Sequence, residues 1–370
     1  MNFDLSEDVK TMREEVRRVL RDRYPTGAVR QQVESGQSLD RDFWRQCAEM
    51  GWTGISIPQA YGGVGFGYEA LCMIAEEIGA ALAPIPFASS IYLTAEALVL
   101  FGSDAQKATW LPRLAAGETV GAAAFGEGPG SADPRGIAAR CRDGRLHGTK
   151  LPVVDGSEAD IAIVTALDEA GEVGLWLVEL AASGVTRCPV ETLDLVRRSV
   201  RIDFDGAAAE RLPSGHGWDA VARLLDRAAI LFAFEQVGGA RASLDMAVGF
   251  AKERFAFGRP IGSFQAIKHK LADLYVALEL ARSNAYYGAW ALDHGAAELA
   301  SAAAAARLSA TEAFTSAAKE NIQTHGGMGF TWESDCHLFY RRARELALTV
   351  GSERYWRDRL IDTLLAGEAA

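Results

Sequence analysis

Residues 254–265 combine residue types that suit a large phosphate-bearing ligand. The segment contains Arg254, Phe257 and Gln265, together with a second arginine and two glycines. A guanidinium group matches the geometry of a phosphate or pyrophosphate, a phenylalanine packs on a flat ring, and a glutamine can hydrogen-bond an adenine or ribose edge. The alternative is a connection between two helices whose arginines merely face solvent, and the residue types alone leave both interpretations open.

A second candidate segment, residues 323–333, contains three glycines within four positions. Because glycine has no Cβ, the backbone can approach a ligand closely there, so Gln323, Gly326 and Gly327 become binding candidates. The same glycines would also end a helix. His325 is tempting as an acid–base group, but a lone histidine at a helix end is more often a cap or a neutral hydrogen bonder.

The composition argues against several other functions. The 370-residue chain has 38 Lys plus Arg against 49 Asp plus Glu, a net charge of −11 that disfavours nucleic acid and anionic membranes as partners. Its five cysteines show no CxxC spacing and its six histidines no HExxH pair, so we expect neither disulfides nor a metal site. With no apolar run of membrane-spanning length and no signal peptide, the expected location is cytoplasmic.

The hydrophobic pattern divides the chain into three zones that would position these segments. The first and last zones show helical periodicity, as in the seam that continues through Leu271, Leu274 and Leu278. The middle zone alternates with period two, as in Val200 and Ile202. We therefore expect an α+β fold with an N-terminal helical domain, a middle antiparallel β domain and a C-terminal four-helix bundle, over residues 1–119, 120–212 and 213–370.

Residues 254–265 and 323–330 together resemble the two signature segments of the acyl-CoA dehydrogenases. Residues 57–67 are similar to a turn in the helical domain of that family, and residues 102–118 are similar to its entry into the β domain. The order of helical domain, β domain and four-helix bundle also agrees. The resemblance therefore extends over the whole chain.

The resemblance implies FAD at a dimer interface and α,β-desaturation of an acyl-CoA thioester. In such a reaction a carboxylate takes the α-proton while flavin N5 takes a hydride from the β-carbon. The two segments would reach the pyrophosphate and adenosine of an FAD seated in the neighbouring subunit. The implied cofactor-binding residues are Arg254, Phe257, Gln265, Gln323, Gly326 and Gly327.

The chain departs from the family where the base and the flavin ring should be. Val350 stands where the family has its glutamate, and it cannot take a proton. At the position where a minority of the family places the base, the chain has Ala228. A Thr-Glu pair and a Trp-Ile-Thr run beside the flavin ring are replaced over residues 126–129 and 152–154.

Two other carboxylates, Glu235 and Glu353, could serve as the base. Glu235 follows Ala228 by about 10.5 Å along a helix axis, on its apolar side, and a buried glutamate paired with an arginine is the favoured interpretation. Glu353 stands at an expected helix start, where a carboxylate complements the helix dipole.

We interpret the chain as the subunit without a catalytic base in a heteromeric acyl-CoA dehydrogenase, donating FAD contacts in trans. A homologous acyl-CoA dehydrogenase subunit would carry the glutamate and most of the acyl-CoA site. An electron-transfer flavoprotein or a similar protein would accept the electrons. The alternatives are a self-sufficient homomeric flavoenzyme, either a dehydrogenase using Glu235 or a flavin oxygenase, and a silent structural subunit.

Overall fold

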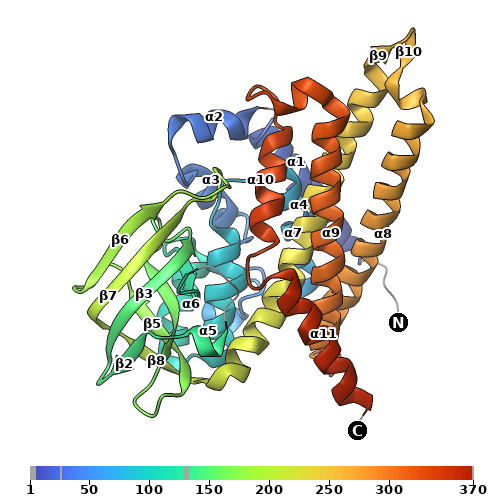
Figure 1. Ribbon diagram of the computed structural model, residues 1–370. Helices are drawn as coiled ribbons and strands as arrows, with labels where there is room; N and C mark the ends of the chain where they lie inside the picture. The colour runs from blue at the N-terminus through green and yellow to red at the C-terminus, as the bar shows by residue number, and fades with distance from the viewer. Residues whose placement is uncertain (1–5, 26, 129–132, 369–370) are drawn as a thin grey trace.

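The chain forms a mainly antiparallel sheet between two helical regions of the sequence. The computed structural model describes residues 6–25, 27–128 and 133–368. The sheet lies on one side of the long C-terminal helices, and most of the N-terminal helices lie between them (Figure 1). This arrangement confirms the predicted fold class. No helix in these described ranges is both long enough and apolar enough to cross a bilayer.

The N-terminal region is helical because its sequence supplies both caps and apolar faces. Ser6 caps the first helix by accepting from the Val9 N–H, and Ser103 with Gln106 forms a reciprocal capping box. The helices here are α1 (Glu7–Arg23), α2 (Ala28–Ser35), α3 (Arg41–Glu49), η1 (Gln59–Tyr61), α4 (Tyr68–Ala81), the π-helix η2 (Ala88–Ala95), α5 (Glu96–Phe101) and α6 (Asp104–Ala115).

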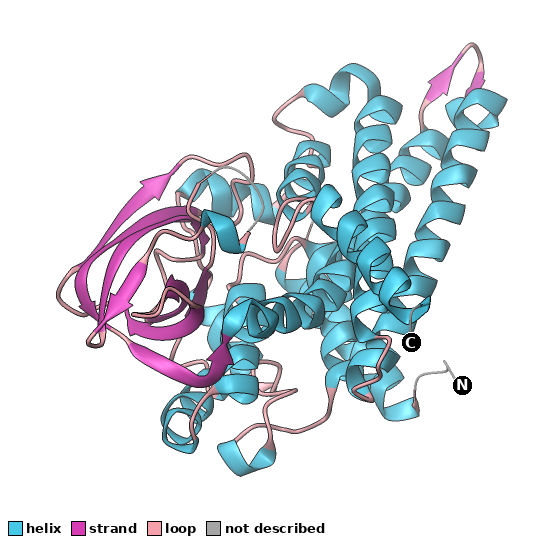
Figure 2. Cartoon of the chain, turned by 60° about the horizontal axis from the view of Figure 1, so that its bottom comes forward, coloured by secondary structure: helices cyan, strands magenta, loops and turns pink. Residues whose placement is uncertain are grey.

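The sheet runs in the order β6-β7-β3-β2-β4-β5-β8, and β1 pairs with β4. Its strands are β1 (Gly121–Ala124), β2 (Arg140–Arg142), β3 (Arg145–Val154), β4 (Ile161–Leu167), β5 (Val173–Glu179), β6 (Val185–Val190), β7 (Ser199–Ala208) and β8 (Glu210–His216), with the short helix η3 (Pro134–Gly136) before β2. Figure 2 shows the strong curvature of this sheet beside the helices.

The alternating pattern predicted for the sheet is present in β7. Val200, Ile202 and Phe204 are buried while Arg201 is exposed, as the period of two requires. The pairings of β4 with β1 and with β2 are parallel, whereas the others are antiparallel. Periodicity alone does not distinguish these two kinds of pairing.

The C-terminal region is dominated by long helices. They are α7 (Gly217–Glu253), α8 (Gln265–Asp293), α9 (Leu299–His325), α10 (Cys336–Leu346) and α11 (Glu353–Glu368). The seam of α8 is buried as predicted, at Leu271, Leu274 and Leu278. Between α7 and α8, the hairpin of β9 (Phe255–Ala256) and β10 (Arg259–Pro260), followed by η4 (Ile261–Ser263), projects beyond the helix ends (Figure 1).

Candidate active site

The two candidate binding segments lie at the same end of the C-terminal helices. Residues 254–265 comprise the C-cap of α7, the β9–β10 hairpin, η4 and the first residue of α8. Gln323 is in the last turn of α9, and η5 (Gly326–Phe330) follows directly. The two segments are joined through Phe250 near the end of α7, whose ring centroid lies 4.2 Å from that of His325.

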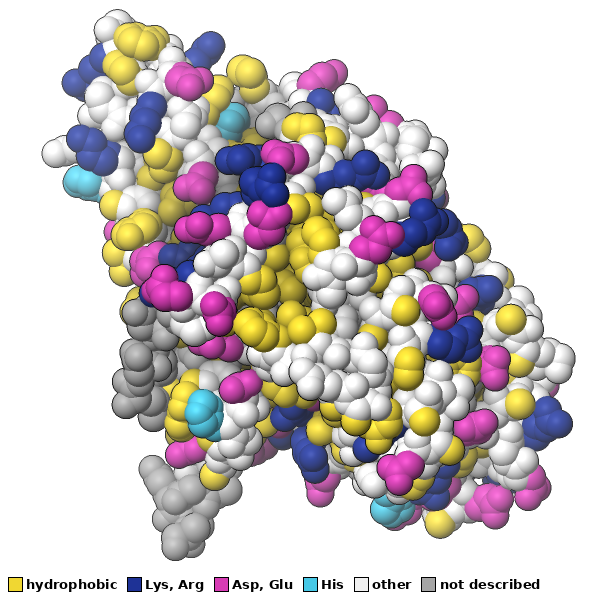
Figure 3. Space-filling view, turned by 180° about the vertical axis from the view of Figure 1, so that it is seen from behind, with side chains coloured by type: hydrophobic (Ala, Val, Ile, Leu, Met, Phe, Trp, Pro, Cys, Tyr) yellow, Lys and Arg dark blue, Asp and Glu magenta, His cyan; other side chains and the backbone are white. Residues whose placement is uncertain are grey.

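The side chains of these segments face outward. Arg254, Gln265 and Gln323 are exposed, and so are the rings of Phe257 at 95% and Phe330 at 81%. Figure 3 shows basic and hydrophobic side chains gathered at this projecting end, in the upper left of the view. Large rings exposed next to arginines suit a surface that another molecule covers.

The glycines of the second segment leave open space above the backbone. Gly326 has φ +60°, and a Cβ built at Gly326 or Gly327 would meet no atom within 4 Å. A ligand could therefore approach this backbone closely. His325 is otherwise engaged, since its Nδ1 lies 2.8 Å from the carbonyl oxygen of Asn321 and its ring lies beside that of Phe250. These contacts favour the structural interpretation of the histidine.

A cavity of about 560 Å³ lies between the β domain, η2, α7 and the loop from α10 to α11. The structure brings together here the positions that the sequence analysis assigned to the flavin ring and the base. They are Gly126, Gly128, Pro152, Val154 and Val350. Pro129, from the same expected turn, lies outside the described residues. The chain therefore has a cavity where these positions meet, and none of these five residues has a side chain that could take a proton.

Val350 occupies a strained backbone position beside this cavity. Its φ is +56°, a left-handed conformation that a β-branched residue rarely adopts. Arg307, buried on α9, donates to the carbonyl oxygens of Leu346 and Thr349 and so holds the loop just before it. Asp155, which also lines the cavity, has φ +58°. Strain of this kind commonly accompanies functional sites.

The surface of α7 facing the cavity is apolar. Leu225 and Phe232 line the cavity, whereas Ala228 and Ala229 are fully buried and do not. Asp226, two residues before Ala228, is ion-paired with Arg359 of α11. Among the described residues, this helix offers the cavity no group that could take a proton.

Glu235 is held in a buried ion pair with two arginines. Its Oε1 lies 2.7 Å from Arg197 Nη2 and 3.3 Å from Arg342 Nη1, and the side chain has no exposed surface. Glu235 is not part of the cavity lining. This geometry agrees with the expected arginine pairing and counts against a role for Glu235 as the base.

Sequence reasoning missed three carboxyl groups that do line the cavity, Asp155, Asp194 and Glu345. Burial raises the pKa of Asp155, and burial together with the charge of Asp194 raises the pKa of Glu345 well above its ordinary value. Glu345 directly follows the sequence Arg341-Arg342-Ala343-Arg344, and the other two acids lie outside the helices and strands. Acids in such settings normally face solvent, so no local signal singled them out.

Comparison with known proteins shows that the chain belongs to the acyl-CoA dehydrogenase family. Residues 6–118 match the N-terminal domain of acyl-CoA dehydrogenases, and residues 215–365 match their C-terminal domain. The chain is 34% identical over 349 residues to the acyl-CoA dehydrogenase IpdE2 of Mycobacterium tuberculosis, covering 94% of both chains. The family resemblance seen in the sequence is thereby confirmed.

Solved structures related to the chain include subunits of two-component enzymes. A variant of the Tcur3481-Tcur3483 steroid acyl-CoA dehydrogenase superimposes with a TM-score of 0.89 at 30% identity, covering 98% of this chain and 99% of that one. The ChsE4-ChsE5 complex of M. tuberculosis superimposes with a TM-score of 0.89 at 26% identity, covering 99% of both chains.

FAD is the cofactor of this family, as expected. A glutaryl-CoA dehydrogenase of Mycobacterium smegmatis, solved in complex with FADH2, has the same fold, with a TM-score of 0.90 at 24% identity over 99% of this chain and 96% of that one. In the present chain, the exposed Arg254 and the open backbone at Gly326 and Gly327 fit contacts to such a ligand from outside. At the positions expected beside the flavin ring, Gly126, Pro152 and Val154 offer no side-chain hydrogen-bonding group.

Proposed function

We propose that this chain is the subunit without a catalytic base in a heteromeric acyl-CoA dehydrogenase. The observation that carries the proposal is the apolar Val350 at the family's base position, in a cavity that neither Ala228 nor Glu235 reaches. A homologous partner subunit would supply the glutamate that removes the α-proton. Bound FAD would supply the acceptor for the hydride.

The role proposed for this chain at the shared site is to hold the FAD of the partner. Arg254 would bind the pyrophosphate through a charge-assisted hydrogen bond. Gln265, Gln323 and the backbone at Gly326–Gly327 would contact the rest of the adenine dinucleotide, and Phe257 would pack against it. The exposure of these groups at one end of the helices supports contacts made in trans.

The outer side of α8 supports association with a second bundle. Val276 and Leu280 are exposed on the side of this helix away from the buried seam, and Tyr275 is exposed at the edge of the seam. Exposed apolar side chains of this kind mark surfaces that another protein covers. A partner with the same fold would lay its own helices here and bring its FAD to the projecting segments.

We infer that the substrate is a bulky acyl-CoA bound mostly by the partner. The similarity to the Tcur3481-Tcur3483 steroid enzyme and to the ChsE4-ChsE5 complex supports this class of substrate and the heteromeric assembly. An electron-transfer flavoprotein or a similar protein would reoxidise the flavin. The runner-up, a homomer that uses Glu235, is disfavoured by the two arginines that pair with this carboxylate.

Co-expression with a homologous subunit that has the glutamate tests the proposal. We expect a yellow complex with two copies of each chain and one FAD per heterodimer. It should dehydrogenate acyl-CoA, while this chain alone should not. Replacing the partner's glutamate by glutamine should abolish turnover, since a general base contributes about 10²–10⁴ in rate. A homomer of this chain with one FAD each, whose turnover is lost in Glu235→Ala, would refute the proposal.

The contact with FAD can be tested separately in that complex. Arg254→Ala should weaken flavin binding about 10- to 100-fold, through loss of roughly 1.5–3 kcal/mol. Arg259→Ala is the matched control, because the Arg259 guanidinium lies over the Phe264 ring, 4.0 Å from its centroid. Flavin retention after dialysis, measured by absorbance, compares the two variants. Equal retention in both would remove Arg254 from the site.

A further inference from the structure

Residues 331–335 form the loop between η5 and α10, and they contact α2 of the N-terminal region (Figure 1). On α2, the Nη1 of Arg30 donates to Asp335 Oδ1 at 2.9 Å. The same nitrogen contacts the carbonyl oxygens of Trp332 and Glu333. The Arg30 and Asp335 side chains are only 21% and 14% exposed, so water screens this ion pair less than it screens a surface pair. We call the following residues the α2 link: Gly27, Arg30, Glu34, Trp332, Glu333 and Asp335.

Asp335 uses its carboxylate for this link and not for its own helix. It is the N-cap residue of α10, yet in the part of the chain that the structure describes its side chain accepts no bond from the amides of that helix. Its Oδ2 accepts instead from the N–H of Gly27, the N-cap of α2, at 2.9 Å. The first turn of α2 contains no acidic residue, so this carboxylate satisfies a free N–H and complements the positive end of the α2 dipole. Asp335 therefore joins two helices from opposite ends of the sequence.

Trp332 is held on three sides by the same set of contacts. Its indole N–H donates to Glu34 on α2. Its ring stacks on that of His337, with 4.6 Å between the centroids. Its carbonyl oxygen contacts Arg30 and lies 3.2 Å from His337 Nε2. The α2 link therefore fixes the loop residue that stands two positions after η5.

Short backbone bonds carry this restraint into η5. The N–H of Thr331 donates to the carbonyl oxygen of Met328 at 3.1 Å, and the N–H of Gly326 donates to that of Gln323. Gly326 and Gly327, whose backbone is open to a ligand, lie between these bonds. Because glycine is conformationally free, a ligand would have to order this segment unless the protein orders it first. Contacts beyond the segment can therefore contribute to its affinity for a ligand.

We propose that Arg30 is a positioning residue for FAD, which holds residues 326–330, through the α2 link, in the conformation that contacts the cofactor. This inference rests on the proposed function and extends it, because it adds a residue of the N-terminal region to a contact otherwise assigned to the C-terminal region. Arg30 acts through the loop, since its hydrogen bonds to described residues all go to Trp332, Glu333 and Asp335. Its loss would leave every group that faces the ligand in place but less ordered.

Hydrogen exchange of this chain alone tests the positioning without FAD or a partner. The reporters are the amides of Thr331 and Ser334, which donate to the carbonyl oxygens of Met328 and Thr331. Arg30→Gln removes the charged donor and should speed their exchange about tenfold. Arg30→Lys keeps a cation at this place and should restore most of the protection. The amide of Ile261, in the first binding segment, should exchange at the wild-type rate in both variants.

The matched control is Arg23→Gln, because Arg23 pairs with Asp40 at the end of α1 and is not part of the α2 link. It should leave the exchange of residues 326–335 unchanged. Wild-type exchange of these residues in Arg30→Gln would overturn the proposal. Faster exchange confined to residues 28–35 would also overturn it, since the link would then serve only to hold α2.

A second variant covers the case in which Arg30→Gln fails to fold. Glu34 is exposed, so Glu34→Ala removes only the bond to the Trp332 indole. It should speed the exchange of the Thr331 amide about twofold, because a single hydrogen bond at the surface contributes less than the buried end of the link. Wild-type exchange in this variant would count as refutation.

Flavin affinity tests the consequence in the complex with a partner subunit that carries the glutamate. Arg30→Gln should weaken flavin binding about 3- to 10-fold, as expected for a residue that acts indirectly, and Arg30→Lys should recover most of this loss. If Arg254→Ala weakens binding and Arg30→Gln does not, the positioning role is wrong and the proposed function stands. If Arg254→Ala binds flavin like wild type, the proposed contact in trans fails, and the role of Arg30 towards FAD fails with it.

Discussion

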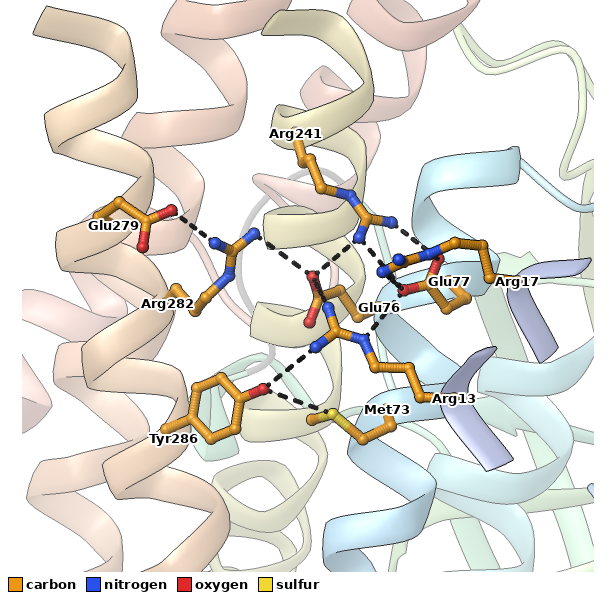
Figure 4. A network of polar contacts seen from close by, with 9 residues as sticks. All are labelled: Arg13, Arg17, Met73, Glu76, Glu77, Arg241, Glu279, Arg282 and Tyr286. Atoms are coloured by element: carbon orange, nitrogen blue, oxygen red, sulfur yellow. Dashed lines mark hydrogen bonds and ion pairs between the residues drawn. The ribbon is translucent and has the colours of Figure 1, made fainter. Parts of the chain in front are cut away.

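Two clusters of charged side chains in this molecule differ in whether arginines or carboxyl groups are more numerous. The interhelix cluster joins α4 to α1, α7 and α8 (Figure 4), and its three carboxylates and four arginines are Glu76, Glu77, Glu279, Arg13, Arg17, Arg241 and Arg282. The cavity cluster, beside Val350, has four carboxyls and three arginines, which are Asp155, Asp194, Glu235, Glu345, Arg197, Arg307 and Arg342. Where arginines are in excess, the carboxylates stay charged. Where carboxyl groups are in excess, some of them keep their protons.

The two clusters also differ in where they lie in the fold. In the interhelix cluster, Glu77 lies 2.8 Å from a guanidinium nitrogen of both Arg17 and Arg241. Burial alone would raise its pKa, but these arginines outweigh burial and lower the pKa of Glu77 to about 2. The cluster binds four helices together, and none of its residues lines the cavity beside Val350. Asp155, Asp194, Arg197 and Glu345 of the cavity cluster do line that cavity.

The largest expected loss of stability follows from removing an arginine from the cavity cluster, in which carboxyl groups outnumber arginines. Arg342→Met leaves Asp194 and Glu235 with one fewer buried partner and should cost about 3–5 kcal/mol in the free energy of unfolding. In the interhelix cluster, Arg17→Met should cost less than about 1 kcal/mol, because Arg17 is 47% exposed and Glu77 keeps Arg13 and Arg241. Urea denaturation measures both, and equal losses would contradict the comparison.

The dependence of the unfolding free energy on acidic pH tests the interhelix cluster separately. Because the pKa of Glu77 is depressed from 4.5 to about 2, its contribution is fully present above pH 4.5 and is lost as the pH falls towards 2. The shift corresponds to about 3 kcal/mol. Glu77→Gln should therefore flatten the acid side of a plot of unfolding free energy against pH. The exposed Glu14→Gln is the control, and a wild-type slope in Glu77→Gln would contradict the assignment.

A smaller effect is expected from the strained backbone at the cavity. Val350→Gly should stabilise the chain by about 1 kcal/mol, because relief of the φ +56° strain exceeds the entropy that glycine loses on folding. Val154→Gly is the matched control, since Val154 lines the same cavity in β3 without a positive φ. It should destabilise. Thermal unfolding of both variants measures the difference, and destabilisation by Val350→Gly would argue against strain.

A feature of this molecule could be predicted from the sequence when residues close together in the chain determine it. The buried row of α8, with Leu271 and Leu278, and the alternation of Val200 and Ile202 could be predicted because periodicity records which face is buried. Val350 could be singled out because a motif fixes its position. The cavity cluster could not be predicted, since its seven residues come from five parts of the chain (Asp155, the loop with Asp194 and Arg197, α7, α9 and α10) that become neighbours only through tertiary packing.

The smallest effect is expected from Glu345→Gln. Its dependence on pH should have the opposite sign to that expected from Glu77→Gln. Below about pH 4.5 the carboxyl of Glu345 is neutral in both the folded and unfolded states, so the variant should lie within about 0.5 kcal/mol of wild type. As the pH rises, the unfolded chain releases this proton first, because the folded pKa is raised. Wild type should therefore lose stability relative to the variant between pH 4.5 and the folded pKa, the reverse of the behaviour at Glu77. Unfolding free energies of both proteins from pH 4 to 8 measure this divergence, and curves that stay parallel would mean that Glu345 holds no extra proton.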